Sequence, residues 1–494
     1  MKHVPGFLAG LVAFLLLATA NGAGYRYGVS DQAAYVPVVL RAENPTAFPR
    51  DAPLLDTQGR FFVLDECLAW IGRTTGASTE SLFFGAYLVS LALVFAGVVS
   101  IGTRLYPSPW LMWGLAALVT LRHHIPRTSV NSLEPYFHPR MMAFGVGLLA
   151  LGAFLRGRTW HAVTLVAVAA LCHVTTALWF GILIGTGLAT LDRRWRRATI
   201  AGGMAAAGVV AWVAMVGPLH ATSATIDGVW REALGDRNFL FATEWPVWAW
   251  AANLGLLALL WWVHTVRVGR ATATAADAAL VWGATALVAV FLLTLPAVAA
   301  HVAIAVQFQV SRVFWLVDML VVAYGLAALG ERRTRRGAAI LALVILAGSV
   351  GRGTYVMLQE HAERALVQFS LPDSRWLDAM RWIARQRIDA YVLADPGHAF
   401  KYGASVRVAA RRDVLLEDDK DSAIALYSRA IAVEVVERRR ALVNFESLTV
   451  DGARALTARY GLTFLVTEAT LDLPEVYHND QFRIYALKPP GPAS

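Results

Sequence analysis

Long apolar runs separated by short polar segments alternate along the first 355 positions of the chain. Each run is about twenty residues long, enough for a helix to cross the hydrocarbon core of a bilayer. A soluble protein could bury one such run, but not a whole series. The pattern therefore predicts an α-helical polytopic membrane domain at 1–355 with about eleven transmembrane helices. The expected spans are 5–22, 82–103, 108–121, 141–155, two within 160–191, 199–217, 246–265, 276–299, 313–330 and 337–351.

The stretch 160–191 is too long for one span and carries polar residues in its middle. His173-Val174-Thr175-Thr176 interrupts the apolar run. We expect two short helices that meet near the outer surface at this point.

The basic residues between the spans predict the orientation. The clusters Arg193–Arg197, Arg267/Arg270 and Arg332–Arg336 fall on the side of Lys2 if the spans alternate. Cytoplasmic loops carry an excess of Arg and Lys, so we expect the N-terminus in the cytoplasm and the segment after about residue 352 outside. As an alternative at the start, Ala18-Thr19-Ala20 resembles a signal-peptidase site, and cleavage there would not change the downstream topology.

The pattern changes after about residue 360, where shorter strand-like and helix-like segments alternate. This alternation predicts a small extracytoplasmic α/β domain at 360–494, doubly wound or similarly layered. The expected helices are Asp373–Arg387, 421–440 and Ala453–Tyr460, and the expected strands are Tyr391–Leu393, Val406–Val408, Thr463–Val466 and Phe482–Ala486.

The composition agrees with a membrane protein, because 57% of the residues are hydrophobic and only 16% are charged. The net charge of +9 is spread over small clusters between apolar runs, so the predicted partner is the lipid bilayer and not a nucleic acid. Cys67 and Cys172 form no disulfide framework and have no metal-type spacing.

Ionisable side chains gather in the expected outer loops. The long outer loop 23–81 holds Asp31 just beyond the first span, together with Asp51, and Phe61–Ile71 in this loop is expected to lie at the membrane interface as a helix. Charged groups at headgroup depth are costly unless they are paired or lie in a wet cavity, so they predict a functional site. The alternative is that they only pair with one another or with lipid phosphates. The other ionisable members of this set, in later outer segments, are Glu134, His138, Arg140 and Arg312, and the uncharged Gln309 lies beside Arg312 in the sequence.

The histidines of these loops have no zinc-motif spacing, so we expect them to form hydrogen bonds or to contact phosphate. No metal ligand is predicted among them.

Several short segments carry a resemblance to a known superfamily. They are Tyr27–Gln32, Phe48–Asp51, Glu134–Arg140, Gln309–Arg312 and, in the tail, Phe400–Arg412. With the layout of spans, outer loops and external domain, the chain resembles the C-type glycosyltransferase (GT-C) superfamily. Within it, the chain is most similar to a group of bacterial homologues without an assigned function.

The resemblance implies inverting transfer of a sugar from a polyprenyl-phosphate donor to a glycan, lipid or protein acceptor. The reaction would take place on the outer face of the bacterial cytoplasmic membrane. Asp31 would take the proton of the acceptor hydroxyl, with Asp51 as the second candidate. Arg140 and Arg312 would neutralise the leaving lipid phosphate. Glu134 and His138 would orient the acceptor or the arginines, and Gln309 would belong to the same binding set.

The superfamily's acidic pair is Asp-Glu or Asp-x-Asp in its clearer forms, whereas Asp31 precedes Gln32 here. The resemblance therefore implies no definite cofactor, and a divalent cation stays open.

Two other classes remain as alternatives. One is a catalytically degenerate scaffold that serves envelope assembly or lipid binding. The other is a transporter, which would place charges and broken helices at the bilayer centre. Asp277 and Asp318 are the few acids within the expected spans.

Overall fold

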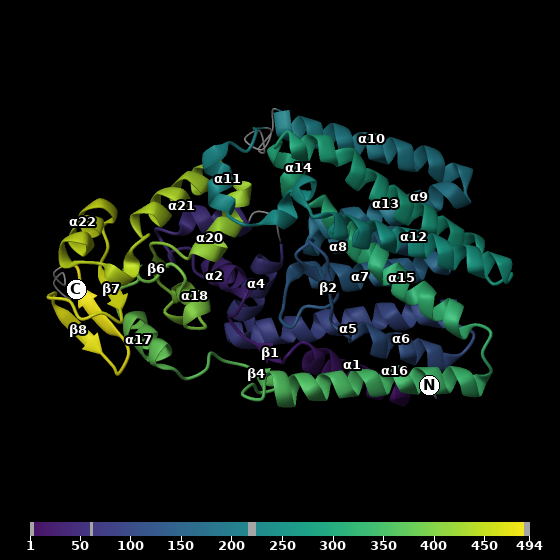
Figure 1. Ribbon diagram of the computed structural model, residues 1–494, viewed down its shortest axis with the longest axis horizontal. Helices are drawn as coiled ribbons and strands as arrows, with labels where there is room; N and C mark the ends of the chain where they lie inside the picture. The colour runs from purple at the N-terminus through teal and green to yellow at the C-terminus, as the bar shows by residue number, and fades with distance from the viewer. Residues whose placement is uncertain (1–3, 60–62, 216–223, 489–494) are drawn as a thin grey trace. The chain divides into compact units, whose positions relative to one another are not determined.

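A computed structural model describes residues 4–59, 63–215 and 224–488. The chain forms two compact units, each assembled from three segments (Figure 1). The first, called the membrane unit below, comprises Met1–Tyr25, Gly85–Thr225 and Arg237–Val367. The second, called the α/β unit, comprises Arg26–Phe84, Ile226–Asp236 and Gln368–Ser494.

The membrane unit is built from apolar helices. Six helices of the described residues are long and apolar enough to cross a membrane, and four further apolar helices have 10–17 residues. The expected count of about eleven spans is therefore not confirmed, although a helix lies at each expected position. The helices are α1 (Val4–Asn21), α5 (Thr79–Leu105, which starts in the α/β unit), α6 (Pro109–Val119), α7 (Pro139–Leu155), α8 (Thr159–Cys172), α9 (Val174–Leu191), α10 (Arg193–Met215), α12 (Val247–Gly269), α13 (Ala275–Ala299), α15 (Val313–Gly330) and α16 (Arg335–Tyr355).

Helix α10 belongs to neither set of apolar helices. Four of its first five residues are arginines, Arg193, Arg194, Arg196 and Arg197. Charged groups are expensive in hydrocarbon, so only the part of α10 beyond these arginines is apolar.

One end of the membrane unit is rich in arginine contacts, and we call it the Arg end. Arg267 at the end of α12 binds Asp277 at the start of α13 (3.2 Å) and Glu331 after α15 (3.1 Å). Arg156 after α7 donates to the Ser100 carbonyl of α5 at 2.6 Å. The first two contacts join the ends of α12 and α15 to the start of α13, and the third joins the end of α7 to α5.

The opposite end, called the loop end, carries uncharged polar contacts between other helix termini. Thr120, which follows α6, shares a 2.6 Å hydrogen bond with Ser349 of α16. Asn21 at the end of α1 donates to the Ser349 hydroxyl at 3.2 Å. The apolar lengths of α1, α6 and α16 therefore run between the two ends of the unit.

The predicted break within 160–191 is found at His173, between α8 and α9. The His173 ring caps α9 by accepting a hydrogen bond from the backbone N–H of Thr176 at 3.2 Å. A side chain that satisfies the first N–H groups of a helix favours a helix start at this point.

The α/β unit contains a mixed five-stranded sheet of order β6-β5-β7-β9-β8. Strand β5 is parallel to β6 and β7, whereas β9 is antiparallel to β7 and β8. Trp376, Met380 and Ile383 of α17 (Arg375–Ala384) pack in one core with Val392 and Ile484 of the sheet. The strands are β5 (Tyr391–Leu393), β6 (Asp413–Val414), β7 (Phe464–Thr467), β8 (Glu475–His478) and β9 (Arg483–Ala486).

Two elements of this unit differ from the expectation. Val406–Val408 was expected as a strand but lies in a short helix, α19 (Val406–Ala409), which Ser405 caps by accepting from the Arg407 N–H at 3.1 Å. The expected helix 421–440 is divided into α20 (Asp418–Ile424) and α21 (Arg429–Ala441). Ser428 begins α21 as its N-cap, and such caps mark helix starts.

The segment Arg26–Phe84 adds three helices to the α/β unit, and Ile226–Asp236 adds α11 (Gly228–Leu234). The three are α2 (Gln32–Glu43), α3 (Ala52–Gly59) and α4 (Leu64–Thr75). Helix α4 covers most of the segment expected as an interfacial helix, of which residues 61 and 62 lie outside the described residues. Trp70 and Ile71 of α4 are exposed.

Candidate functional site

A buried ion pair at the loop end of the membrane unit joins Glu134 to Arg140. Arg140 donates to the Glu134 carboxylate at 2.6 Å, and both side chains are buried. Asn131 donates to the second carboxylate oxygen at 3.1 Å. The pair lies where the polar loop after α6 enters α7, so a buried charge pair is held at the start of an apolar helix.

His138 and His173 lie beside this pair. His138 precedes Pro139, the first residue of α7, and its backbone is extended (φ −139°, ψ 130°), as expected of a residue before proline. Its Nδ1 accepts from the Arg140 N–H at 3.1 Å. The His138 and His173 rings meet edge to face with centroids 6.4 Å apart. His138 is thus fixed to the backbone at the start of α7, and the His173 ring lies against it.

Gln309 and Arg312 lie at the start of α15, and the charge of Arg312 reaches the same cluster. Gln309 has a left-handed backbone (φ 48°, ψ 53°) and precedes the single turn Val310–Arg312. The positive charges of Arg312 and Arg140 both act on the His173 ring, which links this turn to the cluster. A left-handed conformation is uncommon for a residue other than glycine and often accompanies a functional constraint.

The first turns of α15 are anchored to the loop that carries Glu134. Trp315 donates from its indole to the Ser132 carbonyl at 3.3 Å and stacks on Phe144, with ring centroids 3.8 Å apart. His123 and Asp318 are 3.0 Å apart, and this hydrogen bond raises the pKa of His123. Asp318 is therefore tied to the loop end. We call Glu134, His138, Arg140, His173, Gln309 and Arg312 the loop-end cluster.

The two candidate acids of the long loop lie in the α/β unit. Asp31, at the start of α2, accepts from Lys420 of α20 at 3.1 Å, and its side chain is 34% exposed. Lys420 also binds Asp419 at 2.9 Å and lies 5.9 Å from the ring centroid of the exposed Phe400. Burial alone would lower the pKa of Lys420, but the charges of Asp31 and Asp419 hold it above its ordinary value. A charged ammonium therefore faces the Asp31 carboxylate.

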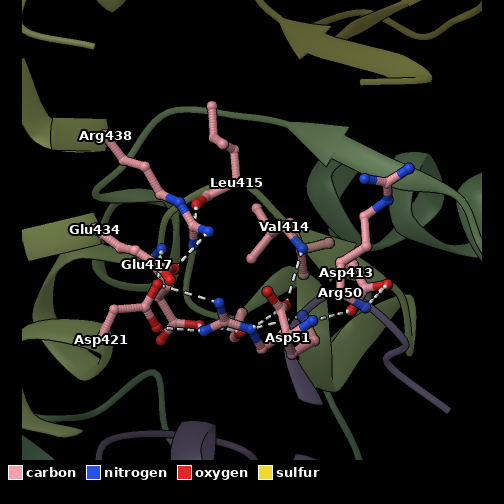
Figure 2. A network of polar contacts seen from close by, with 12 residues as sticks. Arg50, Asp51, Asp413, Val414, Leu415, Glu417, Asp421, Glu434 and Arg438 are labelled. Atoms are coloured by element: carbon pink, nitrogen blue, oxygen red, sulfur yellow. Dashed lines mark hydrogen bonds and ion pairs between the residues drawn. The ribbon is translucent and has the colours of Figure 1, made fainter. Parts of the chain in front are cut away.

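Asp51 belongs to a buried network around Arg407 (Figure 2). It accepts from Arg407 Nε at 2.7 Å, and only 1% of its side chain is exposed. The rest of the guanidinium binds both carboxylate oxygens of Asp421, at 2.5 and 3.1 Å, and lies 3.8 Å from Glu417. Asp413, six positions after Arg407, accepts hydrogen bonds from the backbone N–H groups of Arg50 and Asp51 at 3.2 and 2.9 Å. We call these five side chains, Asp51, Arg407, Asp413, Glu417 and Asp421, the Arg407 network.

Burial and charge shift the pKa values within this network. Burial raises the pKa of Glu417 to about 7, and burial together with the charge of Asp51 raises the pKa of Asp413 to about 6. Burial would lower the pKa of Arg407, but the charges of Asp421 and Asp51 hold it well above its ordinary value. Ser405 donates a hydrogen bond to Glu417. The network is thus a dry, acid-rich cluster centred on one permanent cation.

The predicted site residues therefore fall into two groups. Glu134, His138, Arg140, Gln309 and Arg312 share the loop-end cluster of the membrane unit. Asp31 and Asp51 belong to the α/β unit, where each is bound to a basic residue of 406–421.

The residues of these sites that were not in the predicted set are His173, Arg407, Asp413, Glu417, Lys420 and Asp421. Lys420 had a signal, since it is one of only four lysines among 44 basic residues. His173 was noted as a helix break and as one of the outer histidines expected to form hydrogen bonds or to contact phosphate. Arg407 lies in the segment Phe400–Arg412 that carries the resemblance but was not singled out, and its partner Asp51 lies 356 positions earlier.

Among the residues that the structure describes, no group of three or more His, Cys, Asp or Glu side chains is arranged to hold a metal ion. The described residues therefore offer no such cluster as a binding site for the divalent cation considered above.

The apolar helices identify the class: a polytopic helical membrane protein that also carries a small α/β unit. No protein-family model matches the chain, and no curated protein matches it. Among solved structures, it is similar to the crystal structure of the Archaeoglobus fulgidus oligosaccharyltransferase in the apo form. The identity is 12%, the TM-score is 0.49, and the match covers 95% of this chain and 70% of that chain. At this level the similarity carries no inference about activity, which we infer from the residues of this chain.

Proposed function

We propose that the protein is a membrane glycosyltransferase that moves a sugar from a polyprenyl-phosphate donor to an acceptor on the outer face of the bacterial cytoplasmic membrane. The observation that carries the proposal is the loop-end cluster. It gathers two guanidiniums, Arg140 and Arg312, with two imidazoles at the termini of apolar helices.

The chemistry of this cluster suits a lipid phosphate. When a sugar leaves its polyprenyl phosphate, negative charge develops on the phosphate oxygens. Guanidiniums bind phosphate through charge-assisted hydrogen bonds, and donors fixed in advance stabilise developing charge most strongly. Glu134 holds Arg140 in place at 2.6 Å, and the His138 cap fixes the start of the same helix. Arg140 and Arg312 are the proposed phosphate-binding residues, supported by Glu134, His138 and Gln309.

Asp31 is the proposed general base for the acceptor hydroxyl. Of the two candidate acids it fits better, because its side chain is 34% exposed whereas Asp51 is enclosed with Arg407. Asp31 lies next to a charged Lys420, which favours its ionised form. A general base must be deprotonated to accept the proton. Asp51 is proposed to stabilise the α/β unit.

The first experiment replaces Asp31 by Asn, which removes the base and keeps the size of the side chain. Purified full-length protein in proteoliposomes is given radiolabelled polyprenyl-phosphate sugars together with a membrane extract as acceptor. Release of polyprenyl phosphate is then measured. We expect Asp31→Asn to lower turnover by roughly 10²–10⁴-fold, the contribution typical of a general base.

The matched control is Asp56→Asn. Asp56 lies in the same segment, is exposed and pairs with Arg41 at 2.6 Å. The control should keep wild-type turnover. Wild-type turnover in Asp31→Asn as well would remove Asp31 as the base, whereas no turnover by the wild type with any lipid-linked sugar would overturn the proposed function.

A further inference from the structure

An apolar groove runs along the membrane unit between α1, α6 and α16. Its cavity volume is about 390 Å³, within the range of pockets that hold small ligands. Helix α1 contributes one face of small residues at helical spacing: Gly6, Ala9, Gly10 and Ala13. Trp110 and Trp113 of α6 and Leu343 and Leu346 of α16 provide further walls.

Two glycines of α1 shape the groove. A Cβ atom at Gly10 would lie 2.2 Å from the Trp113 ring, so this glycine lets the indole lie directly against α1. A Cβ atom at Gly6 would meet nothing within 4 Å, because it points into open space. The lining of α1 extends from Gly6 to Leu17, which corresponds to about 16 Å of helix. The groove is therefore long and narrow, and it runs parallel to the helices.

The groove leads toward the loop-end cluster. Thr120, a lining residue, shares the 2.6 Å hydrogen bond with Ser349, and Asn21 joins them. Just beyond Asn21, a Cβ at Gly22 would lie 3.0 Å from Pro135, the neighbour of Glu134. An apolar chain in the groove would thus have its polar end at the loop end of the membrane unit, on the side of the loop that carries Glu134.

From this arrangement we infer that the groove binds the isoprenoid chain of the polyprenyl-phosphate donor, an inference that rests on the proposed function. The lining is almost entirely apolar and belongs to membrane helices, where hydrocarbon is the surrounding solvent. A polyprenyl phosphate has one chain and one phosphate, which suits a single groove that leads to the loop end. A phospholipid could place only one of its two chains in this groove.

The test uses full-length protein in phosphatidylcholine nanodiscs and a benzophenone-bearing polyprenyl phosphate as the probe. After irradiation, labelled peptides are mapped by mass spectrometry, with unlabelled polyprenyl phosphate or phosphatidylglycerol as competitor. We expect label on Gly6–Leu17, Trp110–Thr120 and Ala342–Leu346, displaced by polyprenyl phosphate but not by phosphatidylglycerol. Gly6→Phe and Ala13→Phe fill the groove from exposed positions and should lower this labelling by roughly tenfold.

Gly202→Phe is the matched control, since Gly202 of α10 is also an exposed helical glycine with open space at its Cβ. It should label like the wild type. Displaceable label at other helices would show that the isoprenoid chain binds elsewhere. This result would contradict the inference about the groove but not the proposed polyprenyl-phosphate donor. Equal displacement by phosphatidylglycerol would show a groove for bulk lipid and would also overturn the inference. No displaceable label anywhere would overturn both the groove and the proposed function.

Discussion

Two buried arginines, one in each unit, have very different surroundings. Arg407 lies among four carboxylates, of which it contacts Asp51, Asp421 and Glu417 within 3.8 Å. Arg140 pairs with the Glu134 carboxylate, and its charge acts together with that of Arg312 on the His173 ring, which lies against His138. An arginine among acids is neutralised by the fold itself and holds distant segments together. An arginine grouped with other cationic and imidazole side chains forms a site that favours binding of an anionic substrate. The comparison separates a structural role, for Arg407, from the phosphate-binding role proposed for Arg140, although burial alone would rank the two arginines equally.

The largest expected effect follows removal of the Arg407 cation. Arg407→Met should destabilise the α/β unit by about 3–5 kcal/mol, because Asp51 and Asp421 lose the guanidinium that binds them both. Urea unfolding followed by far-UV circular dichroism or limited proteolysis measures this loss. Arg381→Met, at an exposed arginine that pairs with Asp373 and Asp378, is the control and should change stability by less than about 1 kcal/mol. Equal stability of the two variants would remove the structural role of Arg407.

Arg140→Lys keeps the positive charge but removes the planar guanidinium, which can donate two parallel hydrogen bonds to one phosphate. We expect turnover of the polyprenyl-phosphate sugar to fall by about 10²–10³-fold, the loss typical when one donor to a developing oxyanion is removed. Thermal unfolding should change little, since Lys can still pair with Glu134. Arg156→Lys at the Arg end of the same unit is the control. An Arg140→Lys protein that unfolds easily and keeps its turnover per folded molecule would make Arg140 structural, like Arg407.

The acid-rich Arg407 network predicts a dependence of stability on pH. The pKa of Glu417 is raised to about 7 and that of Asp413 to about 6, so both groups bind protons more tightly in the folded state. Their contribution to stability is complete below the unfolded pKa values near 4 and is lost as the pH rises to about 7. In Glu417→Gln, the free energy of unfolding should fall by about 1–3 kcal/mol less between pH 4.5 and 7 than in the wild type. Urea unfolding at several pH values measures this difference. An unchanged slope would show that Glu417 does not titrate in this range.

The smallest effect is expected for Lys420, which positions Asp31. Lys420→Met should lower turnover by roughly tenfold and shift its pH profile, because a neighbouring ammonium favours the ionised carboxylate. Lys420→Arg should restore most of the activity. Lys401→Met is the control, since Lys401 also binds two acids of this unit, Asp395 and Glu446. A lower turnover with an unshifted pH profile would assign Lys420 a purely structural role.

The order of apolar and polar residues was enough to predict features that depend on residues close together in the sequence. The break at His173 follows from a run too long for one span, and the strands β5, β7 and β9 follow from short apolar segments. The loop-end residues were predicted as a site because charged groups at the ends of apolar helices are costly unless they are paired or functional, and their role in a site stays a prediction.

Long-range contacts explain what local pattern missed. Val406–Val408 contains two β-branched residues and looks like a strand, but Arg407 is held by Asp51, which lies 356 positions earlier. The burial of that arginine and the Ser405 cap decide the helix, and neither can be read from the three residues alone. The pairing of Asp31 with Lys420 likewise joins residues 389 positions apart.

The most direct test of the central claim measures transfer by the wild-type protein. Proteoliposomes containing the full chain receive radiolabelled polyprenyl-phosphate sugars and membrane acceptors, and labelled product is counted beside Asp31→Asn and Arg140→Lys. We predict labelled product with at least one donor and its loss in both variants. Label from no lipid-linked sugar, or equal label in all three proteins, would contradict the assignment of the loop-end cluster and Asp31 to glycosyl transfer.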